Sequence, residues 1–217
     1  MARRQDHTPA QLQQLTMETV LKLLQQQPAS SLSLRQIARE VGYSPGTLIN
    51  QFGSYSLLLL AANARTLDQI YRELLAAIDH ADSPQQTLEA CALSYLNFAS
   101  QHPYQWRLLF EHQLPEQDHL PDWQQQRIDN VFTLLQQQLA ILKPRANASD
   151  CAQTARTIWA SVHGICVLAL DDKLFTPGNI SGRSMIHSLL SHYLPAWIKD
   201  EKETVMHNQQ ATEGSQP

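Results

Sequence analysis

The sequence is poor in glycine, with seven residues in 217, and none of them forms a phosphate-binding loop. Nucleotide sites lined by backbone amides need glycine-rich turns, which this chain lacks. A nucleophile elbow of the G-x-S-x-G type is missing too, and no coupled carboxylate pair stands out. These absences predict that the protein binds no cofactor and is not an enzyme.

Cysteine is also scarce, because Cys91, Cys151 and Cys166 form an odd set without a C-x-x-C pair. All three lie in apolar helical patterns, which favours buried thiols in a reducing compartment over a disulfide framework. No apolar run approaches the roughly 18 residues of a transmembrane helix, and no charged start precedes an apolar stretch. We therefore expect a cytoplasmic protein without a membrane partner.

Net charge is low, at −4, which argues against a general nucleic-acid coat. The charge is uneven, however. Residues 1–55 hold five basic and three acidic side chains, a net charge of +2, which leaves −6 for the remainder. A basic end on an acidic body suits contact with DNA at that end. Chance scatter of so few charges explains the asymmetry equally well.

The stretch 33–54 has the pattern of a helix-turn-helix. Ser33 and Gln36 have the spacing of an S-x-x-Q capping box ahead of a helix with one apolar face. Gly42 ends that helix, since glycine adopts the left-handed backbone of a helix exit. Ser44 then caps a second helix, in which a proline at the first position misses no hydrogen bond. Two short helices joined in this way form the unit that enters a DNA major groove.

The second helix directs Leu48 and Phe52 inward and leaves a polar outer face. Backbone amides and hydroxyls at its start suit phosphate contacts. Asn50 and Gln51 are the predicted base readers, since amides pair with adenine. The residues that this pattern predicts at the DNA are Arg35, Ser44, Pro45, Gly46, Thr47, Asn50 and Gln51.

This stretch resembles the DNA-binding region of the tetracycline-repressor (TetR) family of bacterial transcription regulators. The matching segments are 34–38 (LRQIA), 42–44 (GYS), 46–48 (GTL) and Phe52. The sequence departs from the family at Ile49 and Gln51, where aromatic or histidine residues are frequent near phosphates. Tyr55 stands where a lysine often contacts the DNA backbone. The resemblance therefore implies a weaker electrostatic grip, with Tyr55 donating one neutral hydrogen bond to DNA.

Apolar residues at helical spacing continue along the chain, and no strand pattern is present. Further helices are expected at Pro9–Gln27, after Gly53, and at Gln85–Gln101, Tyr104–His112, Asp122–Leu142, Ser149–Leu170 and Gly182–Lys199, with Ser149 or Asp150 capping the penultimate one. The predicted fold is all-α, and nine helices match the TetR architecture. We expect a DNA-binding domain over 1–55, a helical ligand-binding and dimerisation domain over 56–200, and a disordered tail over 201–217.

A second resemblance covers the C-terminal half. The segment 158–164 (IWASVHG), together with His102-Pro103 ahead of 106–110 (WRLLF), resembles the WHG-type C-terminal domain of some TetR-like regulators. The family pairs its last two helices with those of a second copy. By that resemblance, the homodimer interface would contain Ala152, Ala155, Met185, Leu189, Tyr193 and Trp197, which combine small residues with a broad apolar face. The alternative is that this face is buried within one chain.

Aromatic residues and one histidine are the candidates for an effector site: Tyr95, Phe98, Trp106, Phe110, Phe132, Trp159 and His163. Ordinary core packing explains such stripes as well, and only the family resemblance favours a cavity. His163 would hydrogen-bond a ligand or, alternatively, serve as a satisfied core histidine. The polar group His112, Glu116, Asp118 and His119 lacks helical ligand spacing, so no metal site is predicted.

Together these observations predict a homodimeric transcriptional regulator that binds double-stranded operator DNA. We expect a repressor that a small apolar or amphipathic effector releases. One alternative is a TetR-like DNA-binding protein controlled by a protein partner without a small-molecule inducer. A more remote alternative is an all-helical enzyme with His163 as base, which would need a second titratable group close by.

Overall fold

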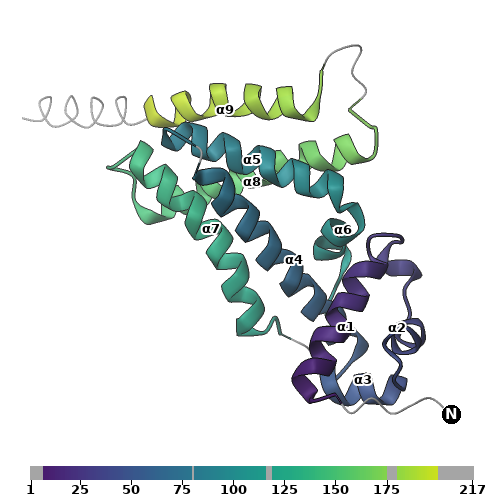
Figure 1. Ribbon diagram of the computed structural model, residues 1–217. Coiled ribbons are helices and arrows are strands. Elements are labelled where there is room, and N and C mark those ends of the chain that lie inside the picture. Colours follow the sequence, from purple (N-terminus) through teal and green to yellow (C-terminus); the bar gives the residue numbers. More distant parts are fainter. Residues whose placement is uncertain (1–6, 80, 116–118, 175–179, 200–217) are drawn as a thin grey trace, which may run out of the picture. The chain divides into compact units, whose positions relative to one another are not determined.

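The computed structural model describes residues 7–79, 81–115, 119–174 and 180–199. Within these ranges the chain forms helices and no strand, which confirms the predicted all-α fold (Figure 1). The helices are α1 (Pro9–Leu23), α2 (Leu34–Val41), α3 (Pro45–Phe52), α4 (Tyr55–Ile78), α5 (Pro84–Gln101), α6 (Pro103–Glu111), α7 (Asp122–Leu142), α8 (Ala148–Leu170) and α9 (Gly182–Lys199), with a short 3-10 helix η1 (Ala29–Ser31). The predicted tail at 201–217 lies outside the described residues.

Two compact units divide the chain. Unit 1 comprises residues 1–73 and 97–131, and unit 2 comprises residues 74–96 and 132–217. The helices α4, α5 and α7 contribute residues to both. The unit that contains the helix-turn-helix thus extends well beyond residue 55, and it includes α6.

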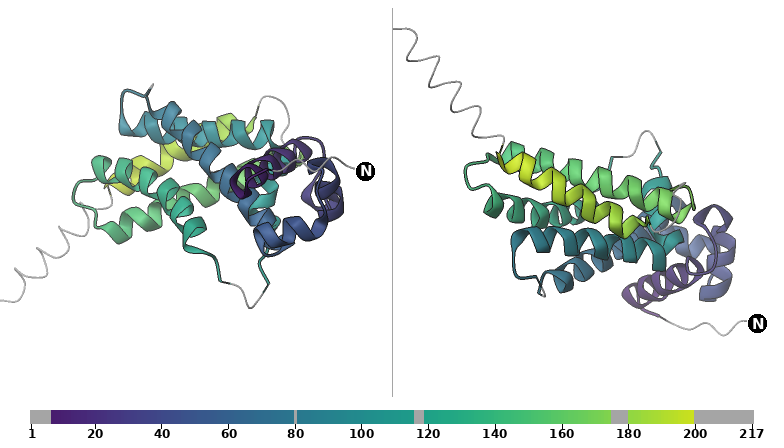
Figure 2. Two further views of the ribbon diagram at one scale, coloured as in Figure 1. Left: turned by 60° about the horizontal axis from the view of Figure 1, so that its bottom comes forward. Right: turned by 90° about the horizontal axis from the view of Figure 1, so that it is seen from above.

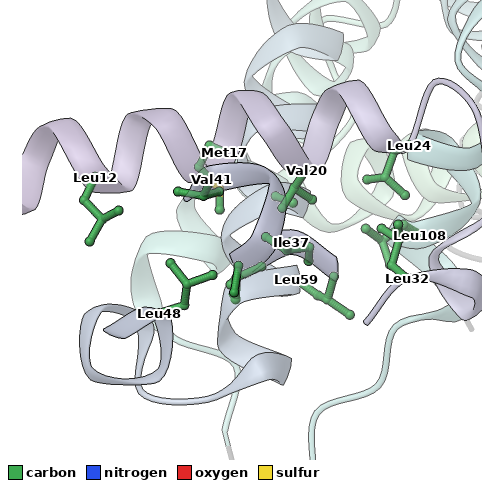
Figure 3. Close-up of a cluster of buried hydrophobic side chains, with 13 residues drawn as sticks. Leu12, Met17, Val20, Leu24, Leu32, Ile37, Val41, Leu48, Leu59 and Leu108 are labelled. Carbon is green, nitrogen blue, oxygen red and sulfur yellow. The ribbon is translucent and has the colours of Figure 1, made fainter. Parts of the chain in front are cut away.

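A single cluster of buried side chains holds the first part of unit 1 together (Figure 3). Helix α1 supplies Met17 and Val20, and these pack against Ile37 of α2 and Leu48 of α3. Both Ile37 and Leu48 have no exposed surface. Burying such a side chain stabilises the fold by about 1.5–3 kcal/mol, so this cluster fixes how α3 is presented.

Helix α6 joins the same cluster through Leu108. Two buried amides support it: the Asn63 side chain donates to the Leu108 carbonyl at 3.3 Å, and the Gln105 side chain donates to the Leu21 carbonyl at 3.5 Å. Buried polar groups of this kind are normally hydrogen-bonded, because an unmade bond costs the full desolvation energy. The cluster therefore joins α2 and α3 to α4 and α6 as well as to α1.

Two local predictions need correction. Helix α1 ends at Leu23, not at Gln27. Helix α8 is capped by Asn147, whose side chain accepts from the Asp150 amide at 2.9 Å, so neither Ser149 nor Asp150 is the cap. Asparagine is among the best N-cap residues, and it precedes both candidates in the chain.

In unit 2, α8 and α9 pack side by side (Figure 2). Helix α9 buries Ile186, Leu190 and Leu194, which repeat every four residues along one face. Gly182 is buried at the start of α9, where an added Cβ would lie 3.3 Å from the Leu96 side chain. A larger residue there would have to displace its neighbours, so this glycine allows the close approach.

Candidate functional site

The turn and the helix caps around α3 match those of the predicted helix-turn-helix. Gly42 ends α2 with φ of +82°, the left-handed conformation expected there. Ser44 then accepts from the Thr47 amide at 3.1 Å and caps α3, with Pro45 at the first position. Because Leu48 is fully buried, the opposite face of α3 points away from the core.

The predicted base reader Asn50 lies on that exposed face of α3, whereas Gln51 is half-buried. At the start of the helix, Pro45 and Gly46 are exposed. An added Cβ on Gly46 would meet only the Ser44 hydroxyl, at an ordinary 3.7 Å. Packing within the chain does not require glycine here, so its missing side chain serves to leave the helix start open.

The capping box predicted at Ser33 is present in its first half. The Ser33 hydroxyl accepts from the Gln36 amide at 3.2 Å. A complete box forms at α1 instead, where Thr8 accepts from the Gln11 amide at 3.3 Å and the Gln11 side chain accepts from the Thr8 amide at 2.8 Å. Each cap satisfies amides that a helix start leaves open.

Arg35 is exposed in the first turn of α2. Among the residues that the structure describes, no carboxylate pairs with it, whereas Arg39 lies 3.6 Å from Glu40. An arginine without an internal partner keeps its full charge and its planar donor set for an anion outside the protein.

Tyr55 has a different place from the one expected. Its hydroxyl donates to the Leu32 carbonyl at 3.1 Å, and burial raises the pKa of this phenol above its ordinary value. A phosphate oxygen can only accept a hydrogen bond. The Tyr55 hydroxyl already donates its one proton to the Leu32 carbonyl, so it cannot also donate to a phosphate. Tyr55 therefore braces the start of α4 against the loop before α2.

A contact that the sequence did not suggest joins the start of the chain to the helix-turn-helix. The His7 ring nitrogen Nδ1 lies 2.8 Å from the Tyr43 hydroxyl, and the His7 amide donates to the same oxygen at 3.4 Å. These residues are 36 positions apart, and no local pattern pairs them. The contact fixes residue 7 beside the turn between α2 and α3.

The seven residues predicted for an effector site fall into both units. Phe98, Trp106 and Phe110 belong to unit 1, where the Trp106 and Phe110 rings meet edge to face at 5.3 Å. Phe98 and Trp106 are almost completely buried, while Phe110 is 41% exposed. Phe98 packs on the His102 ring at 4.9 Å, so this group has the character of a packed core.

The other four, Tyr95, Phe132, Trp159 and His163, form one contiguous group in unit 2, which we call the aromatic cluster. The Phe132 and Trp159 rings lie 5.6 Å apart, edge to face, and the Trp159 and His163 rings lie 5.4 Å apart. The Tyr95 hydroxyl lies 3.1 Å from His163 Nδ1. Three helices thus bring four of the seven predicted residues together, whereas Phe98, Trp106 and Phe110 lie in unit 1.

Burial lowers the pKa of His163 below its ordinary value. The histidine therefore stays neutral near pH 7, with one ring nitrogen as donor and the other as acceptor. A charged residue that the sequence did not single out extends the cluster: the Arg156 guanidinium lies 4.6 Å above the Phe132 ring. The cluster consequently offers an apolar surface, a neutral polar pair and a cation.

The residues predicted for a dimer interface occupy different environments. Ala155 is completely buried within the chain, so its side chain is not available on a surface. Ala152, Met185, Leu189, Tyr193 and Trp197 are half-buried, and the Trp197 ring is covered by the Lys143 ammonium at 4.9 Å. An added Cβ on Gly164, in the middle of α8, would meet no atom within 4 Å.

The remaining chemistry of the described residues is plain. Cys91, Cys151 and Cys166 are free and buried, and burial raises the pKa of Cys91 and of Cys166 to about 12. No group of three metal-ligating side chains occurs among the residues described; Glu116 and Asp118 of the weighed polar group lie outside them. No described helix combines the length and apolarity that would span a membrane.

The fold and the presented helix define a helix-turn-helix DNA-binding protein. Residues 17–62 match the model of the "bacterial regulatory proteins, tetR family", and residues 88–191 match that of the "tetracyclin repressor-like, C-terminal domain". Together the two matches span more than half of the sequence and include both segments of the second resemblance. The chain belongs to the TetR family of DNA-binding transcriptional regulators.

Solved structures share the fold at low identity. A Rhodococcus sp. RHA1 protein of unknown function has a TM-score of 0.71 at 19% identity, over 89% of this chain and 98% of its own. A tetR-family regulator from Streptomyces coelicolor has a TM-score of 0.66 at 16% identity, over 96% and 90%. AibR, in complex with isovaleryl coenzyme A and operator DNA, has a TM-score of 0.56 at 14% identity, over 85% and 98%. No curated protein sequence matches the chain.

Proposed function

We propose that this TetR-family protein is a homodimeric repressor whose grip on operator DNA is released by a small apolar or amphipathic effector. The observation that carries the proposal is the aromatic cluster of unit 2, where a neutral histidine and a tyrosine hydroxyl face each other in apolar surroundings. The helix-turn-helix supplies the DNA-reading half of the function.

At the DNA, α3 is the recognition helix. Asn50 has the exposure and the amide that read an adenine edge in the major groove. The open start at Gly46 admits a phosphate to the helix amides, and the unpaired guanidinium of Arg35 supplies a second backbone contact. Gln51 is half-buried and serves as a weaker reader.

The dimer interface is the outer face of α8 and α9. Gly164 has open space where a side chain would be, and glycine inside a helix costs about 1 kcal/mol relative to alanine. A close approach by a second copy explains why the chain carries it there. Met185 and Leu189 are half-buried apolar neighbours one turn apart on α9, and they provide the apolar area that an isologous contact needs.

For the effector, the aromatic cluster defines the chemistry. Phe132 and Trp159 provide apolar surface, the Tyr95–His163 pair provides one donor and one acceptor, and Arg156 attracts an anionic end. The bound isovaleryl coenzyme A of AibR has this combination of a short apolar group and anionic groups. By analogy of fold, a carboxylate with a short apolar chain or an acyl thioester is the effector class that fits this cluster.

Release follows from linkage between the two sites. An effector shifts the protein away from the operator-bound state only if it binds the two states with different affinity. Helix α4 begins beside α3 at Tyr55 and continues into unit 2. As a continuous helix of 24 residues, it is the element through which a change at the cluster reaches the helix-turn-helix.

The enzyme alternative gains one feature, because the Tyr95 hydroxyl is the second titratable group near His163 that the sequence did not reveal. A base and a phenol alone do not make a catalytic site. The alternative of control by a protein partner predicts that no small acyl compound changes DNA binding.

The test combines oligomeric state with effector response. We expect the double variant Leu189→Glu/Tyr193→Glu to sediment as a monomer, since it places charges in the apolar face, while Leu75→Glu, at a 40% exposed position of α4, stays dimeric. We also expect His163→Ala to lose effector-induced release while it keeps effector-free DNA binding. A dimeric Leu189→Glu/Tyr193→Glu protein would place the interface elsewhere, and an unchanged effector response in His163→Ala would remove the cluster as the effector site.

A further inference from the structure

A cavity of about 410 Å³ lies between α1 and α4 within unit 1. Helix α1 lines it with the half-buried Leu21 and, from the core side, with Met17, which is only 2% exposed, and helix α4 contributes two arginines, Arg65 and Arg72. This volume is within the range of small-molecule sites. The cavity shares no residue with the proposed DNA contacts or with the aromatic cluster.

Two carboxylates, Asp68 and Glu18, line this cavity together with the two arginines, but among the described residues neither carboxylate forms an ion pair with Arg65 or Arg72. Asp68 also lines it, but Asp68 is engaged by Arg127, whose Nε lies 2.9 Å from a carboxylate oxygen. Arg65 donates to the neutral Gln14 side chain at 2.9 Å, and Arg72 donates to the Asp68 backbone carbonyl at 3.2 Å. In the part of the chain that the structure describes, neither Arg65 nor Arg72 is paired with a carboxylate.

The one other acidic group of the cavity lies on the opposite helix. Glu18 belongs to α1, and its carboxylate accepts from the side-chain nitrogen Nε2 of Gln14 at 2.7 Å. Glu18 thus repels a negatively charged ligand group from the α1 side, whereas on the α4 side the Asp68 carboxylate is ion-paired with Arg127 and the two arginines attract the group. Arg65 and Arg72 are seven residues apart, which is two helical turns, so they lie on the same face of α4.

We propose that this α1–α4 cavity binds an organic anion, with a carboxylate or phosphate held by Arg65 and Arg72 and an apolar tail against Leu21, next to the buried Met17. Guanidinium groups donate two parallel hydrogen bonds to either anion, and such charge-assisted bonds are about twice as strong as neutral ones. Met17 lines the cavity from the core side, and its flexible thioether can adjust to a tail that packs there.

Binding in this cavity would act directly on the packing of the helix-turn-helix. Met17 belongs to the buried cluster that also contains Ile37 of α2 and Leu48 of α3. A ligand that contacts α1 and α4 together favours the spacing of these helices seen here. By thermodynamic reciprocity, it couples to any change of that spacing on DNA. The cavity is thus a second regulatory input, separate from the proposed effector site of unit 2.

The experiment is a methyl NMR titration of the full-length protein labelled with [methyl-13C]methionine. Met17 reports on the cavity, Met185 of α9 is an internal control, and Met17→Leu assigns the signal. The probes are 4-phenylbutyrate, 4-phenylbutyl phosphate and the neutral 4-phenylbutan-1-ol, whose ring shifts a nearby methyl signal. We expect saturable movement of the Met17 signal with at least one anionic probe and at least tenfold weaker binding of the alcohol.

The matched variants decide the assignment to the two arginines. Arg65→Gln/Arg72→Gln is expected to raise the dissociation constant at least tenfold, while Arg145→Gln/Arg183→Gln, at exposed positions outside the cavity, leaves it unchanged. A response to only one of the two anions supports the proposal and identifies the head group. The proposal would be overturned if no probe moved the Met17 signal, or if the alcohol bound as tightly as the anions. It would also be overturned if Arg65→Gln/Arg72→Gln bound the anion as tightly as the wild type.

One further variant separates this site from the proposed effector site. His163→Ala removes the polar group of the aromatic cluster and is expected to leave the Met17 titration unchanged. If His163→Ala abolished the Met17 response while Arg65→Gln/Arg72→Gln kept it, the anion would belong to the cluster and the cavity proposal would fail. If the cluster did not bind an effector at all, the Met17 titration would still stand.

Discussion

The helix-turn-helix and the aromatic cluster use their polar side chains in opposite ways. In the helix-turn-helix, Ser33 and Ser44 cap backbone amides three residues ahead. In the cluster, the Tyr95 hydroxyl and His163 Nδ1 contact each other at 3.1 Å across 68 positions of the sequence. The first arrangement shapes the backbone and makes a rigid surface for reading DNA. The second arrangement leaves the backbone alone and places two hydrogen-bonding groups at the proposed effector site.

The largest expected effect tests the rigidity of the helix-turn-helix. Leu48→Ala removes a fully buried side chain, and large-to-small changes of this kind cost about 2–5 kcal/mol. We expect a loss of this size in the free energy of urea unfolding. Asn50→Ala, on the exposed face of the same helix, serves as control with a change within about 0.5 kcal/mol. A small loss in Leu48→Ala would mean that α3 is not held by its core.

The next effect concerns the DNA-reading surface. Asn50→Ala is expected to reduce discrimination at one position of the operator by about 1–3 kcal/mol, because a bidentate amide contact is lost. Binding of the wild type and the variant to single-base operator variants measures this difference. A uniform loss of affinity across all sequences would make Asn50 a backbone contact instead of a reader.

A smaller effect tests the capping chemistry. Ser44→Ala removes the acceptor of the Thr47 amide and is expected to lower the free energy of unfolding by about 0.5–2 kcal/mol. Ser44→Asp keeps an acceptor at the same place and is the matched control. Equal losses in the two variants would show that the hydroxyl has another role.

The smallest effect is a pH dependence that originates in the cluster. Burial lowers the pKa of His163 in the folded state below the ordinary value of 6.5. The unfolded chain then binds more protons below pH 6.5, so stability falls as the pH drops from 6.5 toward the lowered folded pKa. We expect urea midpoints of His163→Gln to depend less on pH between 7.5 and 5 than those of the wild type.

His112 needs a separate control, because burial lowers its pKa too and its Nε2 lies 3.3 Å from the Ser56 hydroxyl. His112→Gln therefore removes its own part of the same pH dependence. If His163→Gln kept the full wild-type dependence, His163 would be less buried in the folded protein than the geometry of the cluster indicates.

The helix-turn-helix could be predicted from the sequence because its determinants are local. Gly42 and Ser44 act within three or four residues of themselves, and each residue type has a strong backbone preference. The predicted termini of α3 and the turn before it agree with the structure for this reason. The sequence does not single out Asn147 as the cap of α8, because two other good caps, Ser149 and Asp150, follow within three residues.

Contacts between distant segments could not be predicted in the same way. Nothing near Tyr55 in the sequence pairs its hydroxyl with Leu32, and nothing near Phe132 places Arg156 over its ring. Such pairs depend on how helices pack, and helical periodicity gives only the buried face of each helix. At the sequence level, the effector candidates share only their aromatic or histidine side chains. The structure divides them between two units.

The most direct test of the central claim is selection of bound sequences from random double-stranded DNA by the full-length protein. If a dimer presents two α3 helices to DNA, the bound sequences contain an inverted repeat with half-sites about one helical turn, or a multiple of it, apart. The same repeat should lose one defined base preference in Asn50→Ala. Enrichment of no inverted repeat, or an unchanged repeat in Asn50→Ala, would contradict this account of how α3 reads DNA.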